Sequence, residues 1–378
     1  MRILYLCTFY HRALLFRQQM DALERRGHYV RAFSSAQYGE GVAEKFRPIM
    51  DGHVIHRECW GRLDRMLFFP RQRKIERQLE RAYDLRSFDI LHSHLLLSSG
   101  YTALRMKMKY GLPYVVSVRA TDLSGFIRLP YFRRMAIRIL KESRGVLFLS
   151  QSHKEELFRR FLSKDETAMV EAKCAVIGNC LESFWQEHTA PRRERDLQKT
   201  DPIRILAVAK IKPIKNLTTA ARAVELLRSR GYDATLTVIG ECQDTAEYQR
   251  IAQFDCVRMR AFMNHEELLT EYRQHDIFLL PSVNETFGRV YLEAMTQGLP
   301  VLYTRGQGFD RTFDDGVVGY PVPCRDPAEI AERLEDVIEN YRAISARCTD
   351  NCALFYEDVI MDRLAGFYEA ALEHRPTA

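Results

Sequence analysis

The chain has no long apolar run. Within its 378 residues, no stretch approaches the ~18 consecutive apolar residues that a membrane-spanning helix needs. The apolar start, Ile3 to Cys7, is too short for the hydrophobic region of a signal peptide and has no small-residue cleavage site. We therefore expect a cytoplasmic protein.

The cysteines and histidines lack the spacing of a metal or redox site. None of the nine cysteines forms a Cys-x-x-Cys pair, and an odd number cannot pair completely within one chain. We expect reduced thiols that are buried as small hydrophobic side chains. His92 and His94 are two positions apart, but no nearby set of carboxylates completes a site, so strand-end histidines are the simpler interpretation.

The charge is distributed unevenly along a chain of otherwise ordinary globular composition. Residues 1–185 carry 32 Lys and Arg against 19 Asp and Glu, or +13, whereas the remainder carries 24 against 31, or −7. A basic half that precedes an acidic half indicates two domains with different partners. Nucleic acid and an anionic membrane surface are the two generic partners of such a basic half.

Short apolar strands alternate with helical stretches, which is typical of a parallel doubly wound sheet. The pattern runs from a strand at residues 3–7 to one at 145–148 and restarts with strands at 203–208, 235–239, 277–280 and 300–303. Between the two series lies a charged stretch, residues 186–200, which we interpret as an interdomain linker. We therefore predict an α/β protein with two domains, at 1–185 and 186–356, and a closing helix in 357–378 that packs on the first domain.

The most informative segment is PSVNETFGRVYLEAMTQGLP, residues 281–300, which follows a predicted buried strand. Glu285 lies in the loop that leaves the strand, and Glu293 lies within a helix that starts after Gly288. Ligands of open α/β sheets bind at this edge, and the start of a helix favours negative charge. A ligand with both phosphates and hydroxyls, such as a sugar nucleotide, suits this combination. The alternative is two solvated glutamates around an ordinary strand, loop and helix.

Six features of the second half match one known family. They are Lys210 and Lys215 in VAKIKPIKN, Gly240 in VIGE, Pro281-Ser282, the Glu285 and Glu293 pair around Phe287-Gly288, Gly298-Leu-Pro-Val, and Gly319 in DDGVVGYPV. In this order they resemble the carboxyl-terminal domain of the retaining family-four glycosyltransferases. The first half matches more loosely, through RRGHYV, FDILHSH, LPYVVSVRATDL and VIGNCLESFW. The resemblance implies the GT-B fold, in which two Rossmann-like domains face a central cleft and a crossover helix returns to the first domain.

The resemblance also implies roles for individual residues. Lys210 and Lys215 would neutralise a diphosphate leaving group, Glu285 would hold hydroxyls of the transferred sugar, and Glu293 would accept hydrogen bonds from the ribose. The remaining implied donor contacts are the backbone at Gly240, the amides near Phe287, Gly288, Arg289 and Val290, and the segment from Arg260 to Phe262 beside the base. Solvated surface lysines and a turn glycine are the alternatives for Lys210, Lys215 and Gly240.

This chain departs from the family pattern at several positions. Arg119-Ala120 replaces the usual His-Gly, and because a guanidinium stays protonated, any catalytic role of Arg119 is electrostatic. The alternative is a structural partner of Asp122. Arg12 and Ala13 stand near the position of the usual amino-terminal glycine pair, and Cys242 replaces a second glycine after Gly240. The geometry on the acceptor side is therefore open.

No Asp-x-Asp triplet occurs in the chain, so the metal-diphosphate clamp of another glycosyltransferase fold is not indicated. We expect a metal-independent enzyme without a cofactor, whose donor is a UDP- or GDP-linked sugar. No enzyme nucleophile is evident in the first half. The resemblance therefore implies a retaining, front-face displacement that the departing phosphate assists.

Two segments of the first half mix basic and apolar residues, at 60–77 and at 125–141. Such mixtures favour peripheral binding to an anionic leaflet, which suggests a glycan or polyprenyl-diphosphate-linked acceptor for cell-surface polysaccharide. The alternative is amphipathic helices whose apolar faces join the core. Two other functions stay open: a non-catalytic nucleotide-sugar-binding protein, and a nucleic-acid-binding Rossmann protein, for which no known binding motif appears.

Overall fold

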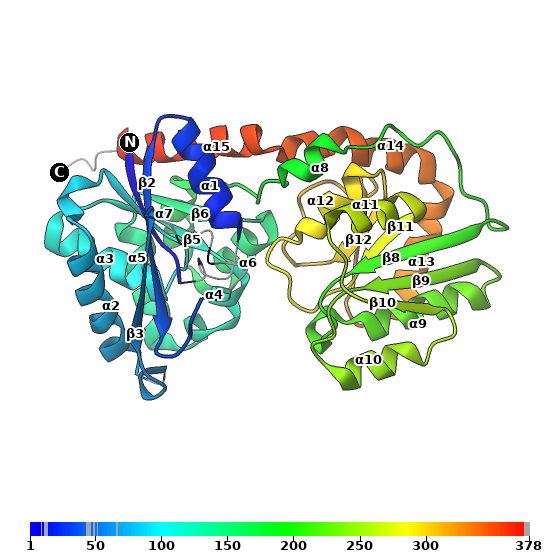
Figure 1. Cartoon of the computed structure of the whole chain (residues 1–378), viewed down its shortest axis with the longest axis horizontal. Coiled ribbons are helices and arrows are strands. Elements are labelled where there is room, and N and C mark those ends of the chain that lie inside the picture. The colour runs from blue at the N-terminus through cyan, green and yellow to red at the C-terminus, as the bar shows by residue number, and fades with distance from the viewer. Residues whose placement is uncertain are drawn as a thin grey trace. The chain divides into compact units, whose positions relative to one another are not determined.

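The computed structural model describes residues 1–8, 10, 14–42, 47, 50, 52–65 and 67–373. The chain forms two compact units, each built on a parallel sheet with helices packed against it (Figure 1). The first unit comprises Met1–Leu149, His153–Ile177 and Met361–Ala378, and the second comprises Ser150–Ser152 and Gly178–Ile360. The boundary expected after residue 185 therefore lies inside the second unit.

The first unit is a seven-stranded sheet in the order β3-β2-β1-β4-β5-β6-β7, in which all neighbouring strands are parallel. Its central strands are short and almost wholly buried, as expected for a sheet covered on both faces. The strands are β1 (Arg2–Leu6), β2 (Tyr29–Gln37), β3 (Val54–Trp60), β4 (Ile90–Ser93), β5 (Tyr114–Val118), β6 (Gly145–Phe148) and β7 (Cys174–Val176).

Helices connect these strands and cover the sheet. Gly27 and Gly111 have positive φ angles just beyond two of the helices, where glycine ends a helix without strain. The helices are α1 (Leu14–Arg25), α2 (Phe68–Ala82), α3 (Ser98–Tyr110), α4 (Ala120–Ser124), α5 (Pro130–Glu142), α6 (Gln151–Phe161) and α7 (Lys164–Glu171).

The second unit is a six-stranded parallel sheet in the order β10-β9-β8-β11-β12-β13. Its strands are β8 (Pro202–Val208), β9 (Asp233–Ile239), β10 (Val257–Arg260), β11 (Ile277–Leu280), β12 (Val301–Thr304) and β13 (Gly319–Val322). Its helices are α8 (Ser183–Glu187), α9 (Leu217–Ser229), α10 (Thr245–Ala252), α11 (His265–Gln274), α12 (Arg289–Thr296), α13 (Pro327–Glu339) and α14 (Tyr341–Asn351). Two separate parallel sheets are thus confirmed.

The closing helix, α15 (Glu357–Glu373), packs on the first sheet. The buried hydroxyl of Tyr368 lies 2.6 Å from Nδ1 of His92 on β4 and donates to the hydroxyl of Tyr5 on β1 at 3.1 Å. The return of this helix to the first unit agrees with the crossover helix that the resemblance implies. No helix within the described ranges is both long and apolar enough to cross a membrane.

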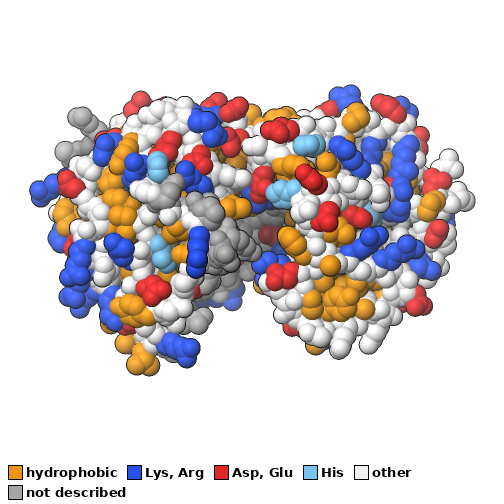
Figure 2. Space-filling model, in the orientation of Figure 1, with side chains coloured by type: hydrophobic (Ala, Val, Ile, Leu, Met, Phe, Trp, Pro, Cys, Tyr) orange, Lys and Arg blue, Asp and Glu red, His pale blue; other side chains and the backbone are white. Residues whose placement is uncertain are grey.

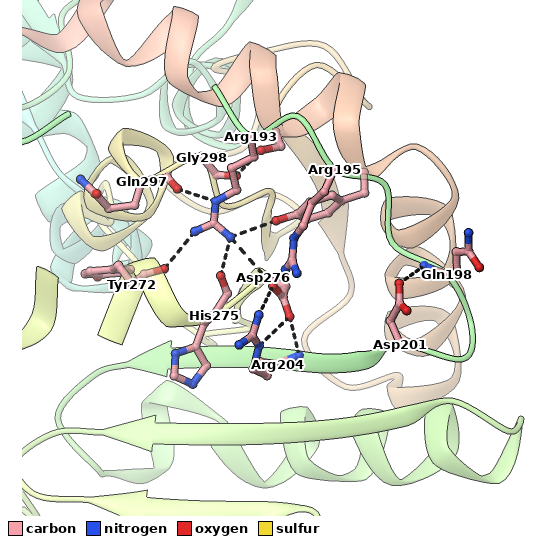
Figure 3. A network of polar contacts seen from close by, with 12 residues as sticks. Arg193, Arg195, Gln198, Asp201, Arg204, Tyr272, His275, Asp276, Gln297 and Gly298 are labelled. Atoms are coloured by element: carbon pink, nitrogen blue, oxygen red, sulfur yellow. Dashed lines mark hydrogen bonds and ion pairs between the residues drawn. The ribbon is translucent and has the colours of Figure 1, made fainter. Parts of the chain in front are cut away.

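The prediction that residues 186–200 form an interdomain linker is wrong. Arg193 is fixed within the second unit by hydrogen bonds to the carbonyls of Gln297 at 2.9 Å, His275 at 2.6 Å and Tyr272 at 3.1 Å (Figure 3). Its Nη1 also donates to the hydroxyl of Tyr341 at 3.0 Å. Arg193 thus holds this segment on the second unit. Its guanidinium donates to backbone carbonyls that would otherwise lack a hydrogen-bond partner.

Candidate functional site

The strand order of the second sheet places a topological switch point between β8 and β11, and we call the sheet edge at this point the crevice. These strands are neighbours, but β8 continues through α9 to β9 on one side, and β11 continues through α12 to β12 on the other. The loops at residues 209–216 and 281–288 therefore leave the same sheet edge in opposite directions. Such a switch point is where open α/β sheets bind ligands.

Lys215 and Glu285 meet in this crevice. Lys215 ends the 3₁₀ turn η6 (Pro213–Lys215), and its Nζ lies 2.7 Å from Oε2 of Glu285. The two side chains are only 19% and 14% exposed. Backbone pairing aligns the loops, since the amide of Val283 donates to the carbonyl of Ile214 at 2.9 Å. The crevice thus holds one cation and one anion in direct contact.

Asn216 fixes the lysine loop, and the sequence reasoning missed it. It has a left-handed backbone with φ of 55°, and its Nδ2 donates to the carbonyls of Pro281, at 3.0 Å, and Cys324. Asparagine tolerates this conformation better than most residues. An asparagine directly before an apolar helical stretch was the available signal.

A third loop, after β12, supports Glu285 and was also missed. The amide of Glu285 donates to Oε1 of Gln307 at 3.0 Å, and the amide of Gly308 donates to the carbonyl of Glu285 at 2.9 Å. A Cβ on Gly308 would overlap the carbonyl of Thr286. The glycine therefore permits the close approach of two loops, which a Gly-Gln-Gly sequence after a strand could have signalled.

The start of α12 offers unpaired donors to the crevice. Gly288 precedes the helix with φ of +82°, and a Cβ there would overlap the ring of Tyr291. The first amides of a helix, here those of Arg289 and Val290, have no carbonyl partner within it. Phe287 is 2% exposed and packs on Phe309, so its ring anchors the loop in the core.

The Arg289 side chain carries a further unpaired donor. Its Nη2 lies 2.5 Å from Oε1 of Glu182, and Nε2 of His265 lies 3.5 Å from the other carboxylate oxygen. Nη1 of Arg289 is buried and has no hydrogen-bond partner among the residues that the structure describes. Glu182 thus holds the guanidinium at the start of α12 with one nitrogen unused. Neither Glu182 nor His265 was among the predicted site residues.

Glu293 is a partly buried carboxyl group on α12. Burial raises its pKa to about 7, against the opposing effect of Arg289. The hydroxyl of Tyr272 donates to its Oε2 at 3.2 Å. The carboxyl group therefore titrates near neutral pH, and its ionised form would accept hydrogen bonds from ligand hydroxyls.

Other predicted donor residues lie at the same sheet edge but are more exposed. The side chain of Lys210 is 55% exposed and lies 3.7 Å from Glu241. Arg260 is 52% exposed and lies 3.7 Å from Glu271, and Phe262 is 74% exposed. Among the contacts of the described residues, none joins Lys210 to Lys215.

Gly240 has a clear structural role. A Cβ at this position would overlap the carbonyl oxygen of Ala209, the first residue of the lysine loop. The glycine allows the chain segments after β8 and β9 to approach each other, and a bridge between Ile211 and Cys242 continues this pairing. Glycine is therefore required at position 240 because of the neighbouring backbone at Ala209, whether or not a ligand binds.

Arg119 occupies the corresponding edge of the first sheet. Its Nε donates to the carbonyl of His94 at 2.9 Å, and its guanidinium lies 5.2 Å from the ring centre of Phe16. Asp122 accepts from the backbone amide of Arg119 at 3.0 Å, and burial raises the pKa of Asp122 to about 6. Arg119 is therefore held by the backbone and an aromatic ring. Arg12 and Ala13 lie outside the described residues.

The two strand-end histidines are buried and stacked, with ring centres 4.0 Å apart. His92 bonds Tyr368 and Oγ of Ser117, and burial lowers its pKa to about 3. The expected structural role of His92 fits these contacts. Within the described part of the chain, no group of three or more His, Cys, Asp or Glu side chains is placed to hold a metal.

Two family models match most of the chain. Residues 15–178 match the model for Glycosyltransferase Family 4, and residues 190–352 match the model for Glycosyl transferases group 1. A Mycobacterium tuberculosis glycogen synthase is 27% identical over 68% of this chain, and the match spans 62% of that relative. A D-inositol 3-phosphate glycosyltransferase from Thermobispora bispora is 28% identical over 78% of this chain and 73% of the relative.

Solved structures share the fold over nearly the whole chain. Sucrose-phosphate synthase from Thermosynechococcus elongatus has a TM-score of 0.73 with 16% identity, covering 99% of this chain and all of that one. The Anabaena protein HepE, solved in complex with UDP, has a TM-score of 0.71 with 16% identity, covering 98% of this chain and all of that one. With its two parallel-sheet domains and matches to both family models, the chain belongs to the group 1 glycosyltransferases of the GT-B fold.

Proposed function

We propose that the protein is a retaining, metal-independent transferase that moves a sugar from a nucleoside diphosphate to a glycan or lipid-linked glycan of the cell surface. The observation that carries this proposal is the contact between Lys215 and Glu285 at the switch point of the second sheet. Lys215 supplies a cation for a departing diphosphate, and Glu285 supplies a carboxylate for sugar hydroxyls. The two charged groups are within hydrogen-bond distance of each other. A donor would then lie with its sugar–phosphate bond beside this pair.

The diphosphate is the part of the donor that gains negative charge as the sugar leaves. Lys215, the exposed Lys210, and the unpaired amides at the start of α12 are preorganised to stabilise that charge. Nη1 of Arg289 is a further available donor in the same region. In this proposal the lysines supply the positive charge that a metal ion supplies elsewhere.

The two glutamates have different tasks in the transfer. Because Glu285 is paired with Lys215, it positions hydroxyls of the sugar and does not act as a general acid. Glu293, with its pKa near 7, accepts hydrogen bonds from the ribose when ionised. Arg119 belongs to the first unit, and its role in turnover would be electrostatic, because its guanidinium stays protonated. The solved complexes of the Anabaena protein with UDP and with UDP-glucose favour testing UDP-sugars first.

The acceptor side of the proposal depends on an exposed apolar surface of the first unit. We call this the exposed apolar surface; it consists of Leu63, Leu67, Phe126, Leu129 and Tyr131, which are 51% to 84% exposed. Its two segments are neighbours, because the rings of Phe69 and Tyr131 lie 5.9 Å apart. Figure 2 shows basic and hydrophobic side chains intermingled on the first unit. Such a surface fits a membrane that carries the acceptor.

Nucleoside diphosphate release tests the catalytic claim. The protein is incubated in EDTA with UDP- and GDP-sugars and a bacterial lipid-linked glycan extract, and the wild type is compared with Glu285→Ala and Lys215→Ala. We expect release by the wild type with at least one donor, and a product that retains the anomeric configuration of the donor. Donor binding without release from any donor would favour the non-catalytic alternative.

Flotation with phosphatidylglycerol vesicles tests the acceptor side separately. We expect the wild type to float, and a Leu63→Ser, Leu67→Ser, Tyr131→Ser variant to stay in the soluble fraction. Leu354→Ser is the matched control, because Leu354 is 51% exposed but lies in the second unit. A wild type that stays in the soluble fraction would refute membrane association without affecting the donor site.

A further inference from the structure

A cavity of about 500 Å³ lies at the edge of the first sheet, beside β7 and α15. Its lining includes Arg144, Lys173 and Val176 from the sheet side and Arg363 and Phe367 from the helix. All of these residues belong to the first unit, and none was among the predicted site residues. The volume lies within the range of about 300 to 1,000 Å³ that is typical of small-molecule sites.

The charged residues that line the cavity are all basic. Within the described part of the chain, Arg144, Lys173 and Arg363 form no ion pair with a carboxylate. Lys173 uses two of its three donors on the carbonyls of Lys141 and Ser143, at 2.8 and 2.7 Å. Three cations around one cavity, none of them ion-paired among the described residues, favour an anionic occupant.

Arg144 provides a second, independent indication of an anion. Its Nη1 is buried and has no hydrogen-bond partner among the described residues. A buried unpaired donor costs free energy, and a charged one costs more. Burial also lowers the pKa of the neighbouring Lys173 to about 8, with further lowering by Lys107 and Arg144 and an opposing effect of Glu142. An anion in the cavity would stabilise the positive charges of Arg144 and Lys173.

The rest of the lining is largely apolar and firmly held. Phe367 packs against the start of β6, where a Cβ on Gly145 would lie 2.7 Å from its ring. Val176 and Ala371 extend the same apolar lining. A phosphate alone would leave these side chains unused, whereas an apolar group attached to it would cover them.

We propose that this cavity binds an amphipathic phosphate, with the phosphate on Arg144, Lys173 and Arg363 and the apolar part over Phe367 and Val176. The phosphate belongs either to a membrane lipid or to a soluble phosphorylated amphiphile. The site is separate from the donor crevice of the second unit, so the inference does not depend on the proposed function.

Calorimetric titration of the full chain with dodecyl phosphate below its critical micelle concentration tests the site. We expect binding that is at least tenfold tighter than that of inorganic phosphate or dodecanol. Arg144→Gln, Arg363→Gln and Phe367→Leu should each weaken it at least fivefold, while Arg159→Gln, on the exposed surface of α6, and Lys215→Ala, in the donor crevice, should leave it unchanged. Circular dichroism confirms that each variant is folded.

Unchanged binding in the folded Arg144→Gln and Phe367→Leu variants would overturn the proposal. Equal binding of inorganic phosphate or of dodecanol would overturn it as well, and so would loss of binding in Lys215→Ala. Competition by phosphatidic acid vesicles would identify a membrane lipid as the source. Competition by soluble alkyl phosphates alone would identify a soluble amphiphile, and both results are consistent with the proposed site.

Discussion

Nζ of Lys215 and Oε2 of Glu285 lie 2.7 Å apart, although the two residues are 70 positions apart in the chain. Both side chains are largely buried, so loss of the lysine would leave a carboxylate without its partner. We expect Lys215→Ala to lower kcat by a factor of about 10² to 10³. We also expect the free energy of unfolding to fall by roughly 1 to 3 kcal/mol. Steady-state kinetics and urea denaturation measure these two effects.

Lys210→Ala is the matched control for the stability effect. Lys210 and Glu241 are each more than half exposed and lie 3.7 Å apart, so their interaction is worth less than about 1 kcal/mol. We expect this variant to lose turnover while its urea midpoint stays within error of the wild type. Equal destabilisation by both substitutions would contradict the difference in burial.

The raised pKa of Glu293 predicts how donor affinity depends on pH. Its folded-state pKa is about 7, and ribose hydroxyls favour the ionised form, so binding below pH 7 must release a proton. The Kd of UDP should therefore fall as the pH rises from 5.5 toward 7 and level off above 7. Calorimetry across this range measures it, and Glu293→Gln should reduce the dependence to the part that comes from the terminal phosphate of UDP, whose pKa is about 6.

The raised pKa of Glu293 also predicts how the stability of the ligand-free protein depends on pH. Because the folded-state pKa exceeds the ordinary value of 4.5, the native state binds more protons than the unfolded state between these pH values. The free energy of unfolding should therefore decrease from pH 4.5 to pH 7, by roughly 2 to 3 kcal/mol from this group. A wild type and a Glu293→Gln variant with parallel stability profiles would exclude this contribution.

Gly288 sets the start of α12 and is predicted to be sensitive to substitution. In Gly288→Ala, the new Cβ would overlap the Tyr291 ring in addition to the strain of its positive φ. Gly306 has a similar φ of +76° with nothing within 4 Å of an added Cβ. We expect Gly306→Ala to cost about 1 kcal/mol and Gly288→Ala to cost more and also to weaken UDP binding. Equal unfolding midpoints would contradict the steric argument.

Arg193 and Arg192 are neighbours with very different surroundings. Arg193 is 15% exposed and makes four hydrogen bonds, whereas Arg192 pairs with Asp350 on the surface. We expect Arg193→Ala to destabilise the protein by roughly 2 to 4 kcal/mol and Arg192→Ala by less than about 1 kcal/mol. Thermal unfolding compares them, and similar melting temperatures would show that the network in Figure 3 contributes little.

Substitution of Arg119 tests whether the first unit contributes to turnover while the second unit binds the donor. Arg119→Ala should lower kcat by a factor of about 10² but leave the Kd of UDP unchanged, because the proposed donor residues belong to the second unit. Arg159→Ala, an exposed arginine of the same unit, should change neither value. Full turnover by Arg119→Ala would show that this residue has only a structural role.

Local patterns in the sequence predicted the part of the site that local structure determines. The apolar strand at 277–280, the loop with Glu285 and the helix ended by Gly298 are contiguous, so their order alone indicated a sheet edge with two carboxylates. The contact between Lys215 and Glu285 depends on the spatial order of the strands, which local sequence patterns do not determine. Gln307, Asn216 and Glu182 were missed because their partners lie far away in the sequence.

The missed elements of the fold have a similar cause. β7 and β13 are edge strands that pair on one side only, β7 has just three residues, and Pro321 is tolerated within β13. Residues 186–200 were misinterpreted because a charged stretch is usually solvated. The acceptors of Arg193 come from several segments of the second unit, and composition carries no information about them.

The central claim is that the crevice of the second unit binds a nucleoside diphosphate through Lys215 and Glu293. Calorimetric titration of UDP and GDP in metal-free buffer at pH 7.5, with the wild type, Lys215→Ala and Arg192→Ala, tests it most directly. We predict that at least one diphosphate binds the wild type and Arg192→Ala with equal affinity and binds Lys215→Ala at least tenfold more weakly. Absence of binding to the folded wild type, or equal binding to Lys215→Ala, would contradict the claim.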